Sequence, residues 1–289
     1  FSITSPRRSA RLTLVCKHWR SVARSAACLW SGVLCGGREH TSPSRYLHLS
    51  RSFPLRVMVH DHVEEASVLF AGNPSRIQHL LMTDNIADTT SWTRRWDPRQ
   101  LLSMVASELI SCTLNFYSWP RTASLDMGQH LFSGQGQRLR RLSIYNSRMT
   151  PTDHLPNLTH LLLDRIIDPD RGQILGLLQR CPLLEEVLIH STRDMIEGHS
   201  PRTNVSLPHL RRLSLDVQSP TAILARLEPS PRALIHIGHF SHPSLADIPT
   251  LPLCHDPALP QRTKLRISEP ATSPLTRSLI ALYDIELAA

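Results

Sequence analysis

The sequence of 289 residues contains no long apolar run. No stretch approaches eighteen consecutive apolar residues, so we expect no transmembrane helix. Residues 1–8 lack the apolar segment of a secretory signal, and the start at Phe1 rather than at Met indicates a fragment. Apolar residues make up 41% of the chain and charged residues 19%, which favours a folded chain over a disordered one.

Paired cysteines are also missing. The six cysteines include no C-x-x-C pair, so the usual signature of a zinc site is absent from the sequence. We predict buried, reduced thiols, which fit a reducing compartment, either the cytoplasm or the nucleus. The six are Cys16, Cys28, Cys35, Cys112, Cys181 and Cys254.

Catalytic motifs are equally scarce. The sequence has no G-x-S-x-G, no H-E-x-x-H and no Walker loop. His60-Asp61-His62 places two histidines on one face of a strand, but no third ligand is evident, so surface histidines are the favoured interpretation. We therefore predict no metal site and no cofactor, and an enzyme is the least expected class of protein.

Long basic runs are missing although the formal net charge is +8. Lysines and arginines are spread along the chain, and only arginine pairs recur, at 7–8, 94–95, 140–141 and 211–212. Nucleic-acid binding is an alternative that the charge permits and the patterning does not favour. A steep loss of binding with salt would support it.

The sequence does contain one six-residue pattern in four copies. The form apolar-x-x-apolar-x-apolar occurs at 139–144, 158–163, 184–189 and 210–215, at intervals of 19, 26 and 26 residues. Its alternation is typical of a strand, and its recurrence is typical of stacked repeats. Weaker copies or further strands are predicted at 55–60, 77–82, 109–114, 233–237 and 263–267, and helices at 62–72, 97–105, 168–181, 219–227 and 273–287.

These copies resemble leucine-rich repeats, in which a strand and a return segment form each unit. The Asn or Cys that usually follows the third apolar residue is missing, so the repeats are irregular. The resemblance implies an α/β fold, with a curved parallel sheet and helices on its convex side. We assign this solenoid to residues 41–289 and expect the helix at 273–287 to cap its open end.

Residues that alternate with the apolar positions are expected on the concave face, where stacking sets them side by side. Polar residues flanked there by Leu162 and Leu188 have the mixed character of a protein-binding surface. A solvated sheet face without a partner is the alternative. The predicted substrate-binding residues are Arg141, Ser143, Tyr145, His160, Asp164, Glu186, His190, Arg212 and Asp216.

Residues 11–30 predict an amphipathic helix. Apolar residues recur at helical spacing, whereas Lys17, Arg20 and Arg24 share the opposite face. A helix of this length is marginal alone, so its apolar side needs a partner. An ordinary helix packed on the core is the alternative.

The residue order in this segment is similar to the C-terminal half of an F-box. The resemblance lies in Leu14-Val15-Cys16-Lys17-His18-Trp19-Arg20-Ser21-Val22-Ala23, followed by Leu29-Trp30-Ser31. It implies docking onto the adaptor subunit of an SCF-type cullin–RING ubiquitin ligase. The adaptor-binding residues that it implies are Leu12, Val15, Cys16, Trp19, Val22, Leu29 and Trp30, within an N-terminal segment assigned to residues 1–40.

The first half of the family's motif, a leucine-proline start and its helix, would precede residue 10, and residues 1–10 contain no such motif. The leading interpretation is an F-box protein with leucine-rich repeats, similar to the large fungal groups. It would catalyse nothing and would present a substrate protein to the ligase. The alternative is a repeat scaffold with a degenerate F-box and no ligase role.

Overall fold

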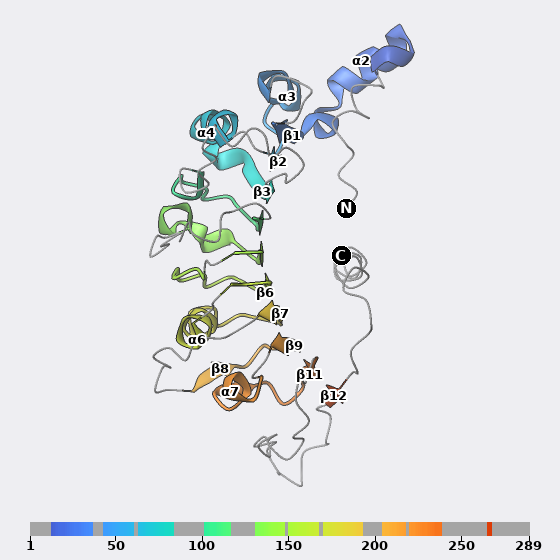
Figure 1. Ribbon diagram of the computed structural model, residues 1–289. Coiled ribbons are helices and arrows are strands. Elements are labelled where there is room, and N and C mark those ends of the chain that lie inside the picture. Colours follow the sequence, from blue (N-terminus) through green and yellow to red (C-terminus); the bar gives the residue numbers. More distant parts are fainter. Residues whose placement is uncertain are drawn as a thin grey trace, which may run out of the picture.

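The chain forms an α/β fold around one large parallel sheet, as Figure 1 shows. The structure is a computed structural model. It describes residues 13–36, 43–60, 63–83, 101–116, 131–147, 150–167, 170–192, 204–217, 220–238 and 265–267.

The sheet contains ten strands that pair in parallel and follow one another in the order of the sequence. Two short strands, β8 (Val205–Leu207) and β10 (Leu227–Pro229), pair with each other instead. The ten are β1 (Gly32–Cys35), β2 (Leu55–His60), β3 (Ile77–Thr83), β4 (Ser111–Asn115), β5 (Arg141–Tyr145), β6 (His160–Asp164), β7 (Glu186–Thr192), β9 (Arg212–Val217), β11 (Leu234–Ile237) and β12 (Leu265–Ile267).

Two rows of buried apolar side chains hold the strands together. Each row takes one residue from each of the eight strands between β1 and β12, because parallel pairing in a constant register places every second residue on the same face. The first row comprises Val57, Leu80, Cys112, Leu142, Leu161, Val187, Leu213 and Ile235. The second comprises Val59, Met82, Leu114, Ile144, Leu163, Ile189, Leu215 and Ile237.

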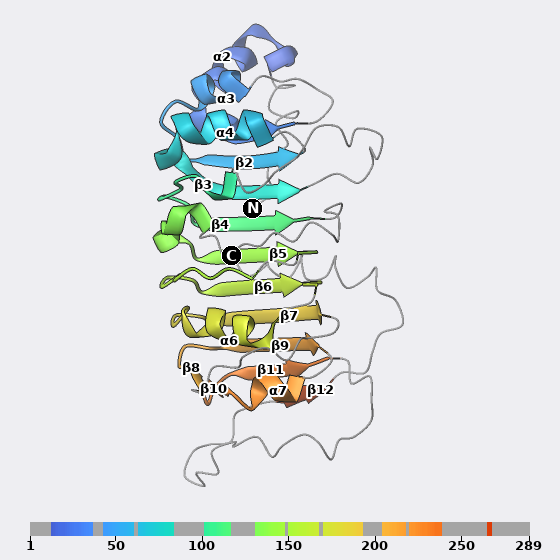
Figure 2. The ribbon, with the colours of Figure 1, turned by 60° about the vertical axis from the view of Figure 1, so that its left-hand side comes forward.

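Helices α4 (Val63–Gly72), α6 (Arg171–Gln179) and α7 (Pro220–Leu224) lie on one side of the sheet (Figures 1 and 2). The column of strands bows in Figure 1, so the face away from these helices is concave. Helix α6 begins where Asp170 accepts a hydrogen bond from the amide of Gly172 at 2.6 Å, which satisfies one of the free N–H groups of its first turn.

Most predicted elements are confirmed. The helices predicted at 62–72, 168–181 and 219–227 occur as α4, α6 and α7, and all the predicted strands are present. The helix predicted at 273–287, residues 84–100 and residues 1–12 lie outside the described residues. No helix in the described part of the chain combines the length and the apolar character required to cross a membrane.

The single helix predicted over residues 11–30 is wrong. Cys16 interrupts it with an extended backbone and caps α2 (Lys17–Ser25), and a separate short helix, η1 (Ala27–Trp30), follows Ala26. Strand β1 then begins at Gly32, inside the 1–40 segment that the sequence assigns to a separate N-terminal unit. The sheet therefore starts before the predicted boundary.

The remaining helices cover the N-terminal end and the convex turns. Helix α3 precedes β2, and three short 3-10 helices occupy connections between strands. They are α3 (Pro43–Ser50), η2 (Pro74–Arg76), η4 (Leu131–Gly134) and η5 (Gly136–Arg138).

Hydrogen bonds from side chains to the main chain connect the irregular convex turns. The buried carboxylate of Asp153 accepts a hydrogen bond from the amide of Leu131 at 2.7 Å. The guanidinium of Arg180, which follows α6, donates to the carbonyl of Asp153 at 3.2 Å and to that of Pro151 at 3.2 Å. The segment 151–153 therefore connects η4 with the end of α6.

We expect Asp153→Ala to lower the free energy of unfolding by about 1–3 kcal/mol, because it leaves the buried amide of Leu131 without this acceptor. Urea denaturation followed by circular dichroism measures the change. The matched control is His154→Ala at the exposed neighbouring position, which we expect to change stability by about 0.5 kcal/mol or less. Equal losses in the two variants would contradict the structural role of the carboxylate.

Candidate functional site

The concave face presents three rows of side chains that run across the strands. They are named here by their position along each strand. The start row comprises Arg56, His79, Ser111, Arg141, His160, Glu186 and Arg212. The middle row comprises Leu34, Met58, Leu81, Thr113, Ser143, Leu162, Leu188, Ser214 and His236. The end row comprises His60, Thr83, Asn115, Tyr145, Asp164, His190 and Asp216.

All nine predicted concave-face residues lie in these rows, and the register brings them side by side as the repeats predict. Whether they bind a substrate stays a prediction. Arg56, Met58 and His60 of β2 also lie on this face, although the predicted site omits them. The sequence signal for these three residues is their alternation with Leu55, Val57 and Val59, which are buried and therefore place them on the opposite face of the strand.

The start row is the basic edge of the concave face. Arg141 and Arg212 are exposed, and neither forms a salt bridge with a carboxylate of the described residues. Burial lowers the pKa of His79 below its ordinary value, and the positive charges of Arg56 and Arg141 lower it further. His79 therefore favours the neutral form at neutral pH.

His160 has an environment of mixed charge. Burial is the largest influence and lowers its pKa, Glu186 opposes this and Arg141 reinforces it. Its Nε2 lies 3.9 Å from a carboxylate oxygen of Glu186, and its Nδ1 lies 2.8 Å from the hydroxyl of Thr159. Glu186 is the one carboxylate of the start row.

The end row carries two acidic groups, Asp164 and Asp216. Burial raises the pKa of Asp164, and the charge of Asp216 raises it further, while Arg165 at 3.8 Å lowers it. Asp164, His190 and Asp216 occupy paired positions on β6, β7 and β9. The two long edges of the concave face therefore differ in charge.

The middle row offers less apolar contact area than the sequence predicts. Leu162 and Leu188 are buried, with only 5% and 8% of their surfaces exposed. Ser214 is buried as well, and its hydroxyl lies 3.1 Å from Nδ1 of His236. The surface available over β6 to β9 is consequently polar, and half-buried apolar side chains remain at Met58 and Leu81.

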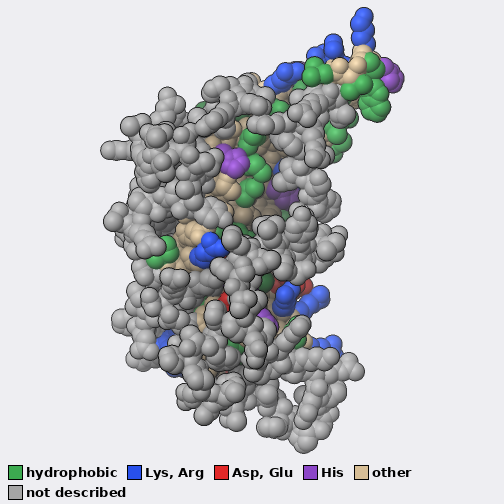
Figure 3. All heavy atoms as spheres, turned by 45° about the vertical axis from the view of Figure 1, so that its right-hand side comes forward, with side chains coloured by type: hydrophobic (Ala, Val, Ile, Leu, Met, Phe, Trp, Pro, Cys, Tyr) green, Lys and Arg blue, Asp and Glu red, His purple; other side chains and the backbone are tan. Residues whose placement is uncertain are grey.

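Helix α2 protrudes at one end of the molecule and exposes hydrophobic side chains beside basic ones (Figure 3). The exposed apolar residues are Trp19 and Val22 in α2 together with Leu14 and Val15 in the turn before it, with between 43% and 75% of each surface exposed. Exposure of clustered apolar side chains to water is unfavourable, and such a surface commonly marks the place where a partner binds.

The predicted adaptor-binding residues divide into two groups. Val15, Trp19 and Val22 are exposed, and exposed Cys16 accepts a hydrogen bond from the amide of Trp19 at 3.4 Å. Trp30, in contrast, is buried, and its Nε1 donates to the carbonyl of Ala23 at 2.7 Å.

The assignment of Trp30 to adaptor binding is therefore corrected: its ring packs within the protein, 5.9 Å from the ring of Tyr46. Leu29 is half-buried and packs against the same core. Leu12 lies outside the described residues. The sequence could not separate these residues because a buried and a docking face have the same apolar composition.

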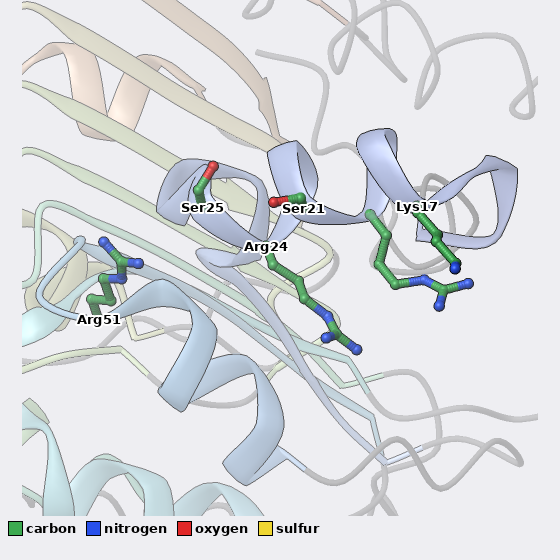
Figure 4. Close-up of a pocket in the computed structure, with 6 residues that line it drawn as sticks. Lys17, Ser21, Arg24, Ser25 and Arg51 are labelled. Carbon is green, nitrogen blue, oxygen red and sulfur yellow. The ribbon is translucent and has the colours of Figure 1, made fainter.

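A basic pocket of about 380 Å³ lies along the face of α2 that carries its lysine and arginines. Its lining comes from α2 and from Arg51 in the turn after α3, as Figure 4 shows. The lining residues are Lys17, Arg20, Ser21, Arg24, Ser25 and Arg51. The opposite, basic face that the sequence predicts for this helix is thus confirmed.

The prediction of buried thiols is only partly right. Cys35, Cys112 and Cys181 are buried, and burial raises the pKa of the Cys181 thiol to about 12. Cys16 and Cys28 are exposed, contrary to the prediction. Cys254 lies outside the described residues.

The candidate metal-binding motif is described only at His60, whose Nδ1 forms a hydrogen bond with the hydroxyl of Thr83. Asp61 and His62 lie outside the described residues. Within the part of the chain that the structure covers, no three His, Cys, Asp or Glu side chains cluster as metal ligands.

The chain matches no protein-family model, no curated protein and no solved structure significantly. The concave face and the N-terminal segment around α2 are therefore the two surfaces that bear on function.

The two tryptophans of the N-terminal segment provide a test of the division of the predicted adaptor-binding residues into an exposed and a buried group. We expect Trp30→Ala to lower the free energy of unfolding by about 3–5 kcal/mol, because it empties a core position. Trp19→Ala, at a surface position, should change it by about 0.5 kcal/mol or less. Thermal and urea denaturation of both variants would measure this. A large loss with Trp19→Ala would contradict its placement on the surface.

Asp164→Asn should raise the free energy of unfolding near neutral pH. The folded-state pKa of Asp164 is raised, so its ionised form costs stability above that pKa, and the cost disappears as pH falls below the unfolded-state value. The difference between variant and parent should therefore vanish in acid. Denaturation curves across this pH range test it, and a less stable variant at neutral pH would mean that the Arg165 ion pair outweighs burial.

Proposed function

We propose that this protein is the substrate-recognition subunit of an SCF-type cullin–RING ubiquitin ligase, with an F-box-like segment before a solenoid of irregular leucine-rich repeats. In this proposal α2 and the turn before it hold the adaptor subunit, and the concave face holds a substrate protein. The chain itself would catalyse nothing and would act in the cytoplasm or the nucleus.

The observation that carries the proposal is the exposed apolar surface of α2 and of the turn before it. The residues most similar to the F-box, Val15 and Trp19, are among its most exposed apolar residues. Fully burying a large apolar side chain contributes about 1.5–3 kcal/mol, so a few such residues suffice for a specific contact. Aromatic residues such as Trp19 are the usual centres of such contacts.

The concave face supports the second half of the proposal. Its polar residues lie in register on a rigid sheet, which fixes their relative positions before any partner binds. Preorganised side chains of this kind favour specific recognition of a partner protein.

The alternative is a scaffold with a degenerate F-box and no ligase role. Trp30 favours it, because one of the residues that resembles the F-box serves the core of this chain. Such a scaffold would keep the concave face as its working surface and would not capture the adaptor.

Co-purification of the full-length protein with the SCF adaptor subunit tests the proposal. We expect Val15→Ala combined with Trp19→Ala to weaken capture by about tenfold or more, because both lie on the exposed surface. Circular dichroism of the variant would verify that it folds.

The matched control combines Phe53→Ala with Val68→Ala, which removes exposed apolar side chains from other elements. We expect it to retain capture. A folded parent protein that captures no adaptor would contradict the ligase role and favour the scaffold. Equal losses in the two double variants would indicate non-specific adhesion rather than an F-box contact.

A further inference from the structure

The arginines of the start row recur at a fixed interval. Arg56 lies on β2, Arg141 on β5 and Arg212 on β9, and the sheet order places three strand spacings between each pair. A histidine lies on the strand after each of the first two, at His79 and His160. The basic edge is thus periodic along the stack.

The interval between the arginines matches that of an extended peptide. Adjacent strands lie about 4.8 Å apart, so three spacings place successive arginines about 14 Å apart. An extended chain advances about 3.4 Å per residue and covers the same distance in four residues, with both side chains on the same face. A helix would need about nine residues for this distance at 1.5 Å per residue.

Positive charge is available to a ligand at Arg141 and Arg212, which are both exposed. Arg141 and Arg212 form no salt bridge within the described residues, whereas Arg211, beside Arg212 in the sequence, lies 3.4 Å from a carboxylate oxygen of Glu185. The electrostatic influence of Arg56 and Arg141 extends to His79 between them. Charge of one sign along one edge attracts a ligand of the opposite sign.

We propose that the start row binds an extended acidic segment of the substrate protein, in which carboxylates four residues apart face Arg56, Arg141 and Arg212. This inference rests on the concave-face half of the proposed function and names the chemistry of its substrate. The segment runs across the strands, parallel to the stacking direction. Bidentate contacts between guanidinium and carboxylate groups provide both affinity and register.

The position of Glu186 makes the spacing of the ligand's carboxylates important. It lies between His160 and Arg212 in the same row, so a ligand with continuous negative charge meets a carboxylate there. A segment with spaced carboxylates places an uncharged residue opposite Glu186 and avoids the repulsion. The row therefore favours spaced acidic residues over a uniform polyanion such as a nucleic acid.

Fluorescence anisotropy with the intact chain and a labelled thirteen-residue peptide tests the inference. The peptide carries three glutamates, each four residues after the previous one, in a Ser/Thr background. Its isomer carries the same three glutamates at adjacent positions. We expect the spaced peptide to bind about tenfold more tightly than the isomer, because only it can engage the three arginines together, and to lose affinity as salt rises.

The two arginine pairs of the chain supply a matched control. We expect Arg141→Ala combined with Arg212→Ala to weaken binding of the spaced peptide by about tenfold or more. Arg140→Ala combined with Arg211→Ala removes the same charge from the positions just before the strands and should change binding by about twofold or less. Equal binding of the two peptides, or equal losses in the two variants, would overturn the inference.

A single-stranded oligonucleotide of similar charge serves as the third ligand. Tighter binding of the oligonucleotide than of the spaced peptide would overturn the inference in favour of nucleic acid. Adaptor capture by the same variants separates the two proposals, because α2 is unchanged. Adaptor capture without peptide binding would contradict this inference and leave the ligase role standing. Peptide binding without adaptor capture would support this inference and favour the scaffold over the ligase subunit.

Discussion

Parallel pairing in one register is the constraint on which the rest of the structure depends. Because side chains alternate between the two faces, a slip of one residue would carry the buried row that contains Leu142 and Leu161 to the concave face and would bury Arg141 and His160. The cost of burying those charges and exposing the leucines fixes the register strongly. The same pairing that excludes water from the core therefore arranges the polar rows. Among the described strand pairings, the register shifts only at strand ends, between Leu55 and Arg56 of β2 and between His190 and Thr192 of β7.

Much of this arrangement follows from the sequence. Alternation of apolar and polar residues assigns each side chain to a face, and repetition of the pattern assigns each strand to a neighbour. The rows from His79 to Asp216 can therefore be predicted from the sequence alone. Other features depend on contacts that no local pattern encodes. Trp30 and Trp19 both belong to the segment that resembles the F-box, yet Trp30 packs near Tyr46 and Trp19 faces solvent. The burial of Leu162 and Leu188 likewise depends on their surroundings in the folded chain, because alternation alone would leave them on an open face.

The break in the N-terminal helix has a local physical cause. Cys16 adopts an extended backbone, and its sulfur accepts the hydrogen bond of the Trp19 amide, which starts a new helix at Lys17. Helical spacing of apolar residues continues across the break, so periodicity alone predicts one helix. After α2, the hydrogen bond from Nε1 of Trp30 to the carbonyl of Ala23 connects the short helix η1 with α2, and the ring of Trp30 packs near Tyr46 of α3. The exposed segment is thereby attached to a rigid body through its C-terminal part while its apolar surface stays open.

The two candidate surfaces differ in the kind of interaction that they favour. The surface of α2 is apolar with basic groups at its side, and burial of apolar area contributes affinity with little dependence on the identity of the partner. The concave face is polar, with arginines along one edge and Asp164 and Asp216 along the other, and paired charges contribute discrimination between partners more than affinity. An adaptor that is shared among many receptors suits the first kind of surface. A substrate that must be selected from many proteins suits the second, because a misplaced charge on a wrong partner is repelled or left unpaired at a fixed position of the sheet.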